Sequence, residues 1–122
     1  MSSPGNGPIR KSMRIATELR VKALLRRCSA GGASAFVMRR GDSERGALYV
    51  KVATLDGRAL LFGPPPASFD VNADEGQTSP HLDPSGVTDA EAEAYLARQV
   101  EYDPDLWVVE IEDRAGRHFL DE

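Results

Sequence analysis

The spacing of apolar residues changes along this chain, and that change limits what the chain can fold into. Val21, Leu24, Leu25 and Cys28 follow the spacing of one face of a helix. From residue 33 onward, apolar residues instead tend to alternate with polar ones, which is the period of a strand. Both patterns occur within 122 residues, so the sequence predicts a single α+β domain.

The first half predicts one helix followed by three strands. The helix is expected over residues 14–30, with Gly31-Gly32 as its C-terminal stop. The strands are expected at residues 33–40, 47–54 and 58–63. Because Asp56-Gly57 is typical of a tight hairpin turn, we expect the three strands to pair in chain order as an antiparallel meander. In the middle strand, Tyr49 and Lys51 are expected to point outward.

The second half predicts one helix followed by two strands. Thr88 and Glu91 match a capping box, and the helix that they begin is expected to end near Tyr102, before Pro104. Strands are expected over residues 106–113 and 117–120, joined by a turn at Gly116. The predicted order is α-β-β-β-α-β-β. We expect a two-layer α+β fold, with two helices on one face of a mostly antiparallel sheet of about five strands.

Two segments are expected to lie outside this packed unit. Residues 1–12 are rich in Pro, Gly and Ser and are predicted to be a disordered tail, so the domain spans residues 13–122. Residues 64–87 hold five of the eight prolines and predict a mobile loop, which contains His81.

Several classes of protein are excluded or disfavoured. The chain has no apolar run long enough to span a membrane and no secretory signal, so we expect a cytoplasmic protein. Its single cysteine excludes an internal disulfide, and Cys28 is interpreted as a core residue. The sequence contains no nucleotide-binding loop or hydrolase motif, and we expect no cofactor.

Charge is distributed unevenly along the chain. Residues 1–61 hold twelve Lys and Arg against four Asp and Glu, whereas residues 62–122 hold three against fifteen. The two halves therefore neutralise each other within one domain, or they mark surfaces that bind a partner or a second copy of the chain. Arginines at a helix end and a strand end could also bind a phosphate group, in nucleic acid or in a small ligand. They are Arg26, Arg27, Arg39 and Arg40. Without an accompanying RNA-binding motif, nucleic acid is the less favoured partner.

The C-terminal half supplies a second group of candidate residues. Asp103, Asp105, Glu110 and Glu112 are acidic, and Trp107 lies among them. Glu110 and Glu112 are expected on the same side of a strand, about 7 Å apart, which suits a divalent cation or paired acid–base catalysis. Neither histidine stands at metal-ligand spacing to them, so solvated charges are the simpler interpretation.

Two blocks resemble a known family. They are LLRRCSAGG at residues 24–32, with FVMRRGD and LYVKV after it, and YDPDLWVVEIEDRAGRHFL at residues 102–120. Together they resemble the bacterial domain-of-unknown-function family number 1491. The resemblance implies a small single-domain bacterial protein and carries over no catalytic residue.

The function expected from the sequence is that of a non-catalytic binding or interaction module, with a second copy of the chain as one candidate partner. Its candidate surface comprises Arg26, Arg27, Arg39, Arg40, Asp103, Asp105, Trp107, Glu110 and Glu112. The alternatives are a nucleic-acid or phosphate-ligand binder that uses the arginines, and a carboxylate-dependent metal enzyme that uses Glu110 and Glu112.

Overall fold

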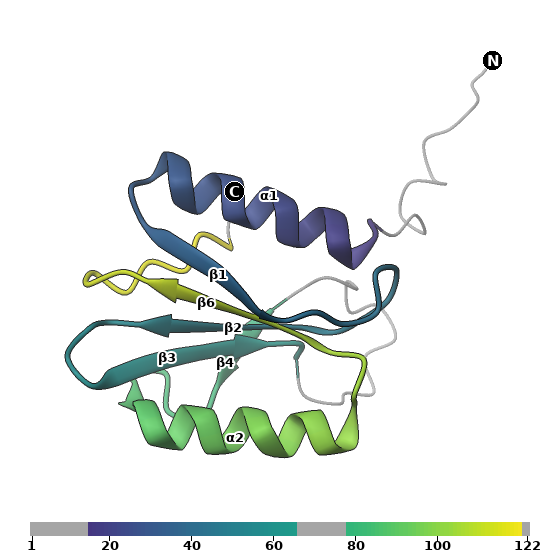
Figure 1. The fold of residues 1–122 in the computed structure, drawn as a ribbon. Coiled ribbons are helices and arrows are strands. Elements are labelled where there is room, and N and C mark those ends of the chain that lie inside the picture. The colour runs from purple at the N-terminus through teal and green to yellow at the C-terminus, as the bar shows by residue number, and fades with distance from the viewer. Residues whose placement is uncertain (1–14, 66–77, 121–122) are drawn as a thin grey trace.

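The computed structural model describes residues 15–65 and 78–120, which form two helices and six strands (Figure 1). The elements are α1 (Thr17–Ala30), β1 (Ser34–Arg39), β2 (Leu48–Ala53), β3 (Arg58–Gly63), β4 (Ser79–His81), β5 (Val87–Thr88), α2 (Asp89–Tyr102) and β6 (Trp107–Glu112). The predicted tail at residues 1–12 lies outside the described residues. The described helices are all too short or too polar to cross a membrane.

The strands form one open sheet in the order β1-β6-β2-β3-β4, with β5 also paired to β3. All neighbours are antiparallel except β2 and β6, which run parallel. The α+β class with two helices and a mostly antiparallel sheet is therefore confirmed, and so is the β2–β3 hairpin. The predicted meander is wrong, because β6 lies between β1 and β2. The two most deeply buried strands, β2 and β6, take the centre of the sheet, where both faces are covered.

The two helices lie on opposite faces of the sheet, so the domain has three layers rather than the expected two (Figure 1). On one face, Val21, Leu24 and Cys28 of α1 pack against β2 and β6. On the other face, Leu96 of α2 packs against residues that include Tyr49. As a result Tyr49 and Lys51, which were expected to point into solvent, are buried beneath α2. Alternation alone predicted one covered face, whereas both are covered.

The expected last strand at residues 117–120 does not form, although Gly116 makes the predicted turn with a positive φ of 76°. Asp113 accepts hydrogen bonds from both the backbone N–H and the guanidinium of Arg117, and this draws the chain back on itself. Phe119 and Leu120 then pack against the α1 side of the core. Burial of these two apolar residues replaces the strand pairing that the sequence predicted.

The start of α2 follows the sequence closely. The Thr88 hydroxyl accepts from the Glu91 backbone N–H, and the Glu91 carboxylate accepts from the Thr88 N–H, which completes the capping box. Just before it, part of the segment expected to be a mobile loop is strand, namely β4 and β5. The middle of that segment, residues 66–77, lies outside the described residues.

Candidate functional site

The four candidate arginines lie at two separate places. Arg26 and Arg27 lie near the C-terminal end of α1, and the Arg27 Nε donates to the Phe119 carbonyl oxygen at 2.8 Å. Arg39 and Arg40 are at the opposite end of β1, and a strand of six residues is about 20 Å long. The structure therefore does not bring the four side chains together into a single phosphate-binding site.

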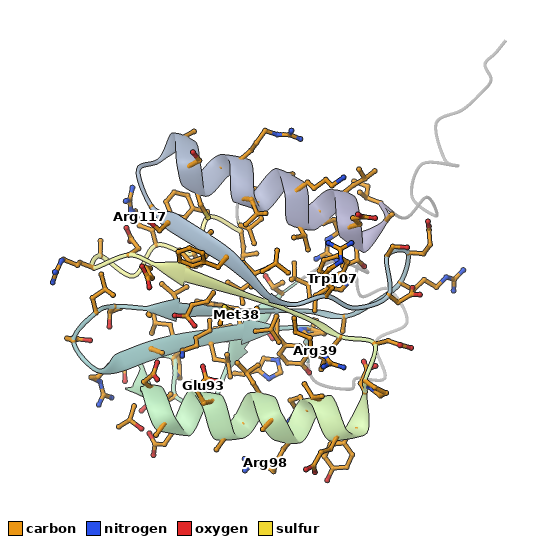
Figure 2. All side chains as sticks on the ribbon, in the orientation of Figure 1. Met38, Arg39, Glu93, Arg98, Trp107 and Arg117 are labelled. Carbon is orange, nitrogen blue, oxygen red and sulfur yellow. The ribbon has the colours of Figure 1, made fainter. Side chains whose placement is uncertain are left out.

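Arg40 and Trp107 do meet, at the end of the sheet where β1 finishes and β6 begins, and Arg39 is bonded to the chain just before β6. Arg39 Nη2 donates to the Pro104 carbonyl oxygen at 2.6 Å, and the Arg40 guanidinium lies 5.0 Å from the centre of the Trp107 ring. Arg40 also pairs with Glu18 at 3.3 Å. Figure 2 shows Arg39 and Trp107 toward one end of the sheet and Arg117 toward the other.

Trp107 anchors this end of the sheet from inside. It is 1% exposed, and its indole Nε1 donates to the Asp42 carbonyl oxygen at 2.8 Å. The backbone N–H of Asp42 in turn donates to the carbonyl oxygen of Asp105 at 2.8 Å. Trp107 and Asp105 thus tie the β1–β2 connection to the start of β6, and the indole ring contributes almost no outer surface.

Glu110, one of the predicted acidic pair, belongs to a cluster of ion pairs around Lys51. Glu110 lies 3.5 Å from the ammonium of Lys51, which also contacts Asp89 and Glu93 of α2 at 2.5 Å each. Burial acts to lower the pKa of Lys51, but its hydrogen bonds to Asp89 and Glu93 and the charge of Glu110 raise that pKa to about 12. Glu110 therefore neutralises a buried cation. Among residues 15–65 and 78–120, no three Asp, Glu, His or Cys side chains are grouped so as to hold a metal.

Two exposed apolar side chains lie on the edge strand β1. Phe36 is 48% exposed and Met38 is 60% exposed, whereas the alternate residues Ala35 and Val37 pack toward α1. Met38 stands at an irregularity where the register with β6 shifts. Among the described strands, only β6 pairs with β1, so the outer edge of β1 has no neighbour. The sequence places Phe36 and Met38 on one face and this strand at one end of the expected meander, but it did not place the later strands relative to it.

A pocket of about 430 Å³ lies at the other side of the molecule, between β2, β4 and α2. Tyr49, Pro64, Pro65, Pro80, His81, Leu82, Tyr95 and Gln99 line it. Tyr49 rests directly on Gly63, where an added Cβ would lie 2.6 Å from the phenol ring. Sequence reasoning missed this pocket because it assigned His81 to a mobile loop and Tyr49 to solvent.

Hydrogen bonds fix the polar groups of the pocket. His81 Nε2 is 2.7 Å from the carbonyl oxygen of Pro64, which can only accept, so Nε2 carries the hydrogen. In the neutral imidazole Nδ1 is then an acceptor, and the Tyr95 hydroxyl, 2.7 Å away, donates to it. The Tyr49 hydroxyl lies 3.5 Å from Oε1 of Gln99. Burial raises the pKa of Tyr49, so this phenol keeps its proton.

Comparison with known proteins identifies the family of this chain. The model of a family described as "Protein of unknown function (DUF1491)" matches residues 15–121. The chain belongs to the DUF1491 family. No protein with a curated description matches it.

Solved structures of DUF1491 proteins share this fold. A crystal structure of a DUF1491 family protein from Caulobacter crescentus CB15 is 38% identical, with a TM-score of 0.74 over 90% of this chain and 96% of that one. An NMR structure of a DUF1491 family protein from the same organism is 41% identical, with a TM-score of 0.71 and coverage of 91% and 96%. The solution structure of protein Atu0922 from A. tumefaciens is 39% identical, with a TM-score of 0.68 and coverage of 82% and 86%. The membership predicted from the two sequence blocks is thus confirmed, and it brings no known activity.

Proposed function

We propose that this DUF1491 protein is an interaction module that binds an extended acidic segment of a partner protein along the outer edge of β1. The observation that carries the proposal is the exposure of Phe36 and Met38 on an edge strand. An added strand would satisfy the outward backbone groups of β1, and its alternate side chains would cover these two apolar residues.

Charge favours an acidic partner. The helix α1, which packs over β1, carries Arg20, Lys22, Arg26 and Arg27 against one acidic residue, Glu18. Arg39 and Arg40 close the same strand. Side chains of an added strand that point toward α1 would therefore lie in a positive field, which favours acidic residues at those positions. The alternate side chains of that strand would cover Phe36 and Met38 on the opposite face, where Glu110 is the neighbour of Phe36 and favours apolar residues over acidic ones.

The same charges disfavour a second copy of the chain at this edge. Antiparallel pairing of β1 with its symmetry mate would place both α1 helices on the same face of one continuous sheet. Their basic residues would then face each other across the junction, and like charges in that arrangement repel. Nucleic acid would suit the positive charge, but it gives no strand to pair with β1 and leaves the apolar side chains without a matching surface.

Site-specific photocrosslinking in native cells tests the proposal. A benzophenone amino acid is placed at position 36, and in a control protein at position 55, because Phe36 and Leu55 are both 48% exposed and Leu55 lies in the distant β2–β3 turn. We expect position 36, but not position 55, to crosslink to an acidic stretch of one other protein. Crosslinks to a second copy of this chain, crosslinks to nucleic acid, or equal crosslinking at both positions would overturn the proposal.

A synthetic peptide of the crosslinked stretch then tests the mode of binding. We expect NMR shifts confined to β1 and its flanks, slower hydrogen exchange of outward β1 amides, and affinity that falls as salt rises. Met38→Glu should weaken binding by charge repulsion, whereas the matched variant Leu55→Glu should bind as the wild type does. Shifts centred on another element would contradict strand addition at β1.

A further inference from the structure

The pocket beneath β4 combines three aromatic rings with two polar groups, namely the Tyr95 hydroxyl and the Gln99 side-chain amide. The His81 ring stands edge-on to Tyr49 and to Tyr95, with ring centres 5.5 and 5.7 Å apart. Three prolines and Leu82 complete the lining, and no lining residue is a carboxylate, lysine or arginine. A volume of about 430 Å³ lies within the range of small-molecule sites, and the uncharged lining favours a neutral ligand.

The hydrogen-bond pattern specifies which polar groups a ligand must carry. The Tyr95 hydroxyl donates its hydrogen to His81 Nδ1, so Tyr95 Oη can only accept a hydrogen bond from a ligand. The Oε1 of Gln99 faces the Tyr49 hydroxyl at 3.5 Å, so the amide NH₂ of Gln99 remains to donate to a ligand. Tyr95 and Gln99 are four residues apart on α2, which places their side chains next to each other on one face of the helix. The pocket therefore presents one acceptor and one donor side by side.

The geometry points to a binding site for a neutral, flat heteroaromatic ring that carries a lactam or carboxamide edge. The ligand N–H would donate to Tyr95 Oη, its C=O would accept from Gln99 Nε2, and its ring would pack among Tyr49, His81 and the prolines. A nucleobase and a nicotinamide group both have this edge. The site lies by β4, at the opposite edge of the sheet from β1, and is therefore independent of the proposed function.

One residue that lines the pocket, Leu82, has an unusual backbone conformation. Leu82, the residue after β4, has a positive φ of 61°, which is strained for a branched apolar side chain. The conformation sets Leu82 in the pocket lining although the side chain stays 42% exposed.

Ligand titrations by NMR, with matched probes, test the site on the full chain. Benzamide carries the ring and the amide edge, methyl benzoate keeps the ring and the carbonyl but has no N–H, and benzoate adds a charge. We expect benzamide to bind at about millimolar concentration, as a ligand of its size should, with shifts at Tyr49, Tyr95 and Gln99. Methyl benzoate should bind about three- to tenfold more weakly, which is the effect of one hydrogen bond, and benzoate more weakly still. Uridine and nicotinamide, titrated in parallel, distinguish the two natural sources by which binds more tightly.

Two variants of equal charge separate the amide contact from general effects. Gln99→Glu replaces the donor by an acceptor of the same shape, whereas Ala97→Glu adds the same charge on the exposed side of α2. We expect Gln99→Glu to lose at least tenfold in benzamide affinity and Ala97→Glu to change it little, with the amide spectra of both variants otherwise unchanged. Equal affinity for benzamide and methyl benzoate, equal losses in the two variants, or no binding of any probe would overturn the proposal.

Discussion

The buried ammonium of Lys51 allows a quantitative test of how α2 is held to the sheet. Lys51 is 3% exposed, and its contacts with Asp89, Glu93 and Glu110 raise its pKa from 10.5 to about 12. At about 1.4 kcal/mol for each pH unit, this rise means that the charged form stabilises the folded state by about 2 kcal/mol. We therefore expect Lys51→Met, which keeps most of the buried side-chain volume, to be less stable by about 2 kcal/mol.

Urea denaturation of wild type and Lys51→Met measures this free-energy difference, and the melting temperature should fall by about 8 °C for a domain of this size. The matched control is Lys22→Met, because Lys22 is 60% exposed and lies 3.9 Å from Glu18 on the surface of α1. A solvated pair of that kind contributes about 0.5 kcal/mol or less. If Lys51→Met is as stable as wild type or more so, the cost of removing the ammonium from water exceeds the gain from its ion pairs, and the reasoning is refuted.

The pH dependence gives a second measurement of the same interaction. The folded-state pKa of Lys51 lies above its unfolded value of 10.5, so its contribution is complete below pH 10.5 and disappears as the pH rises through about 12. The stability difference between wild type and Lys51→Met should therefore be constant from pH 7 to about pH 10 and shrink above it. A difference that shrinks already between pH 7 and 9 would assign the effect to another group.

Three further predictions test the elements around the candidate sites. Thr88→Ala removes the capping hydroxyl of α2 and should cost about 1 kcal/mol in urea denaturation, and a loss below about 0.3 kcal/mol would mean that the capping box contributes little. Gly63→Ala places a Cβ 2.6 Å from the Tyr49 ring, so we expect a loss of about 1–3 kcal/mol together with NMR shifts of the pocket residues; unchanged Tyr49 signals would contradict the close approach. Hydrogen bonds from Arg117 lower the pKa of Asp113 below its ordinary 3.8, so the stability that ionised Asp113 contributes is present above pH 3.8 and is lost as the pH falls further. Asp113→Asn should therefore be less stable than wild type at pH 7, and the difference should narrow as the pH falls below 3.8; a difference that does not narrow in acid would point to packing instead of charge.

Local signals in the sequence predicted the elements well. The helical spacing of Val21, Leu24 and Cys28 located α1, and the capping box at Thr88 located the start of α2 to the residue. Both signals depend on neighbours within four positions, which the chain brings together by itself. The prediction of a strand at residues 117–120 was wrong because another local interaction intervened. The hydrogen bond from Arg117 to Asp113 turns the chain away from a hairpin.

The candidate sites were less predictable, because each depends on segments far apart in the sequence. The four arginines looked like one set in the sequence, but α1 and β1 carry them to opposite ends of a strand. The pocket joins Tyr49, His81 and Tyr95 from three elements, and no spacing between these residues suggests that they meet. The strand that pairs with the inner side of β1 is β6, about 70 residues further along the chain, and not β2 as the meander predicted.

The sequence by itself determined the α+β class, the two helices, the β2–β3 hairpin and the buried position of Cys28, whereas Trp107, expected in the interaction surface, proved to be buried. These follow from local periodicity and turn chemistry, which operate over a few residues. Only the tertiary structure decided that β6 enters between β1 and β2, and that α2 covers the second face of the sheet. Insertion of β6 and packing of α2 determine that Lys51 is buried among carboxylates and that Tyr49 forms a pocket wall. The placement of β6 and α2 is stabilised by the burial of apolar surface between segments that are distant in the sequence. The free energy gained in this way cannot be read from the order of neighbouring residues.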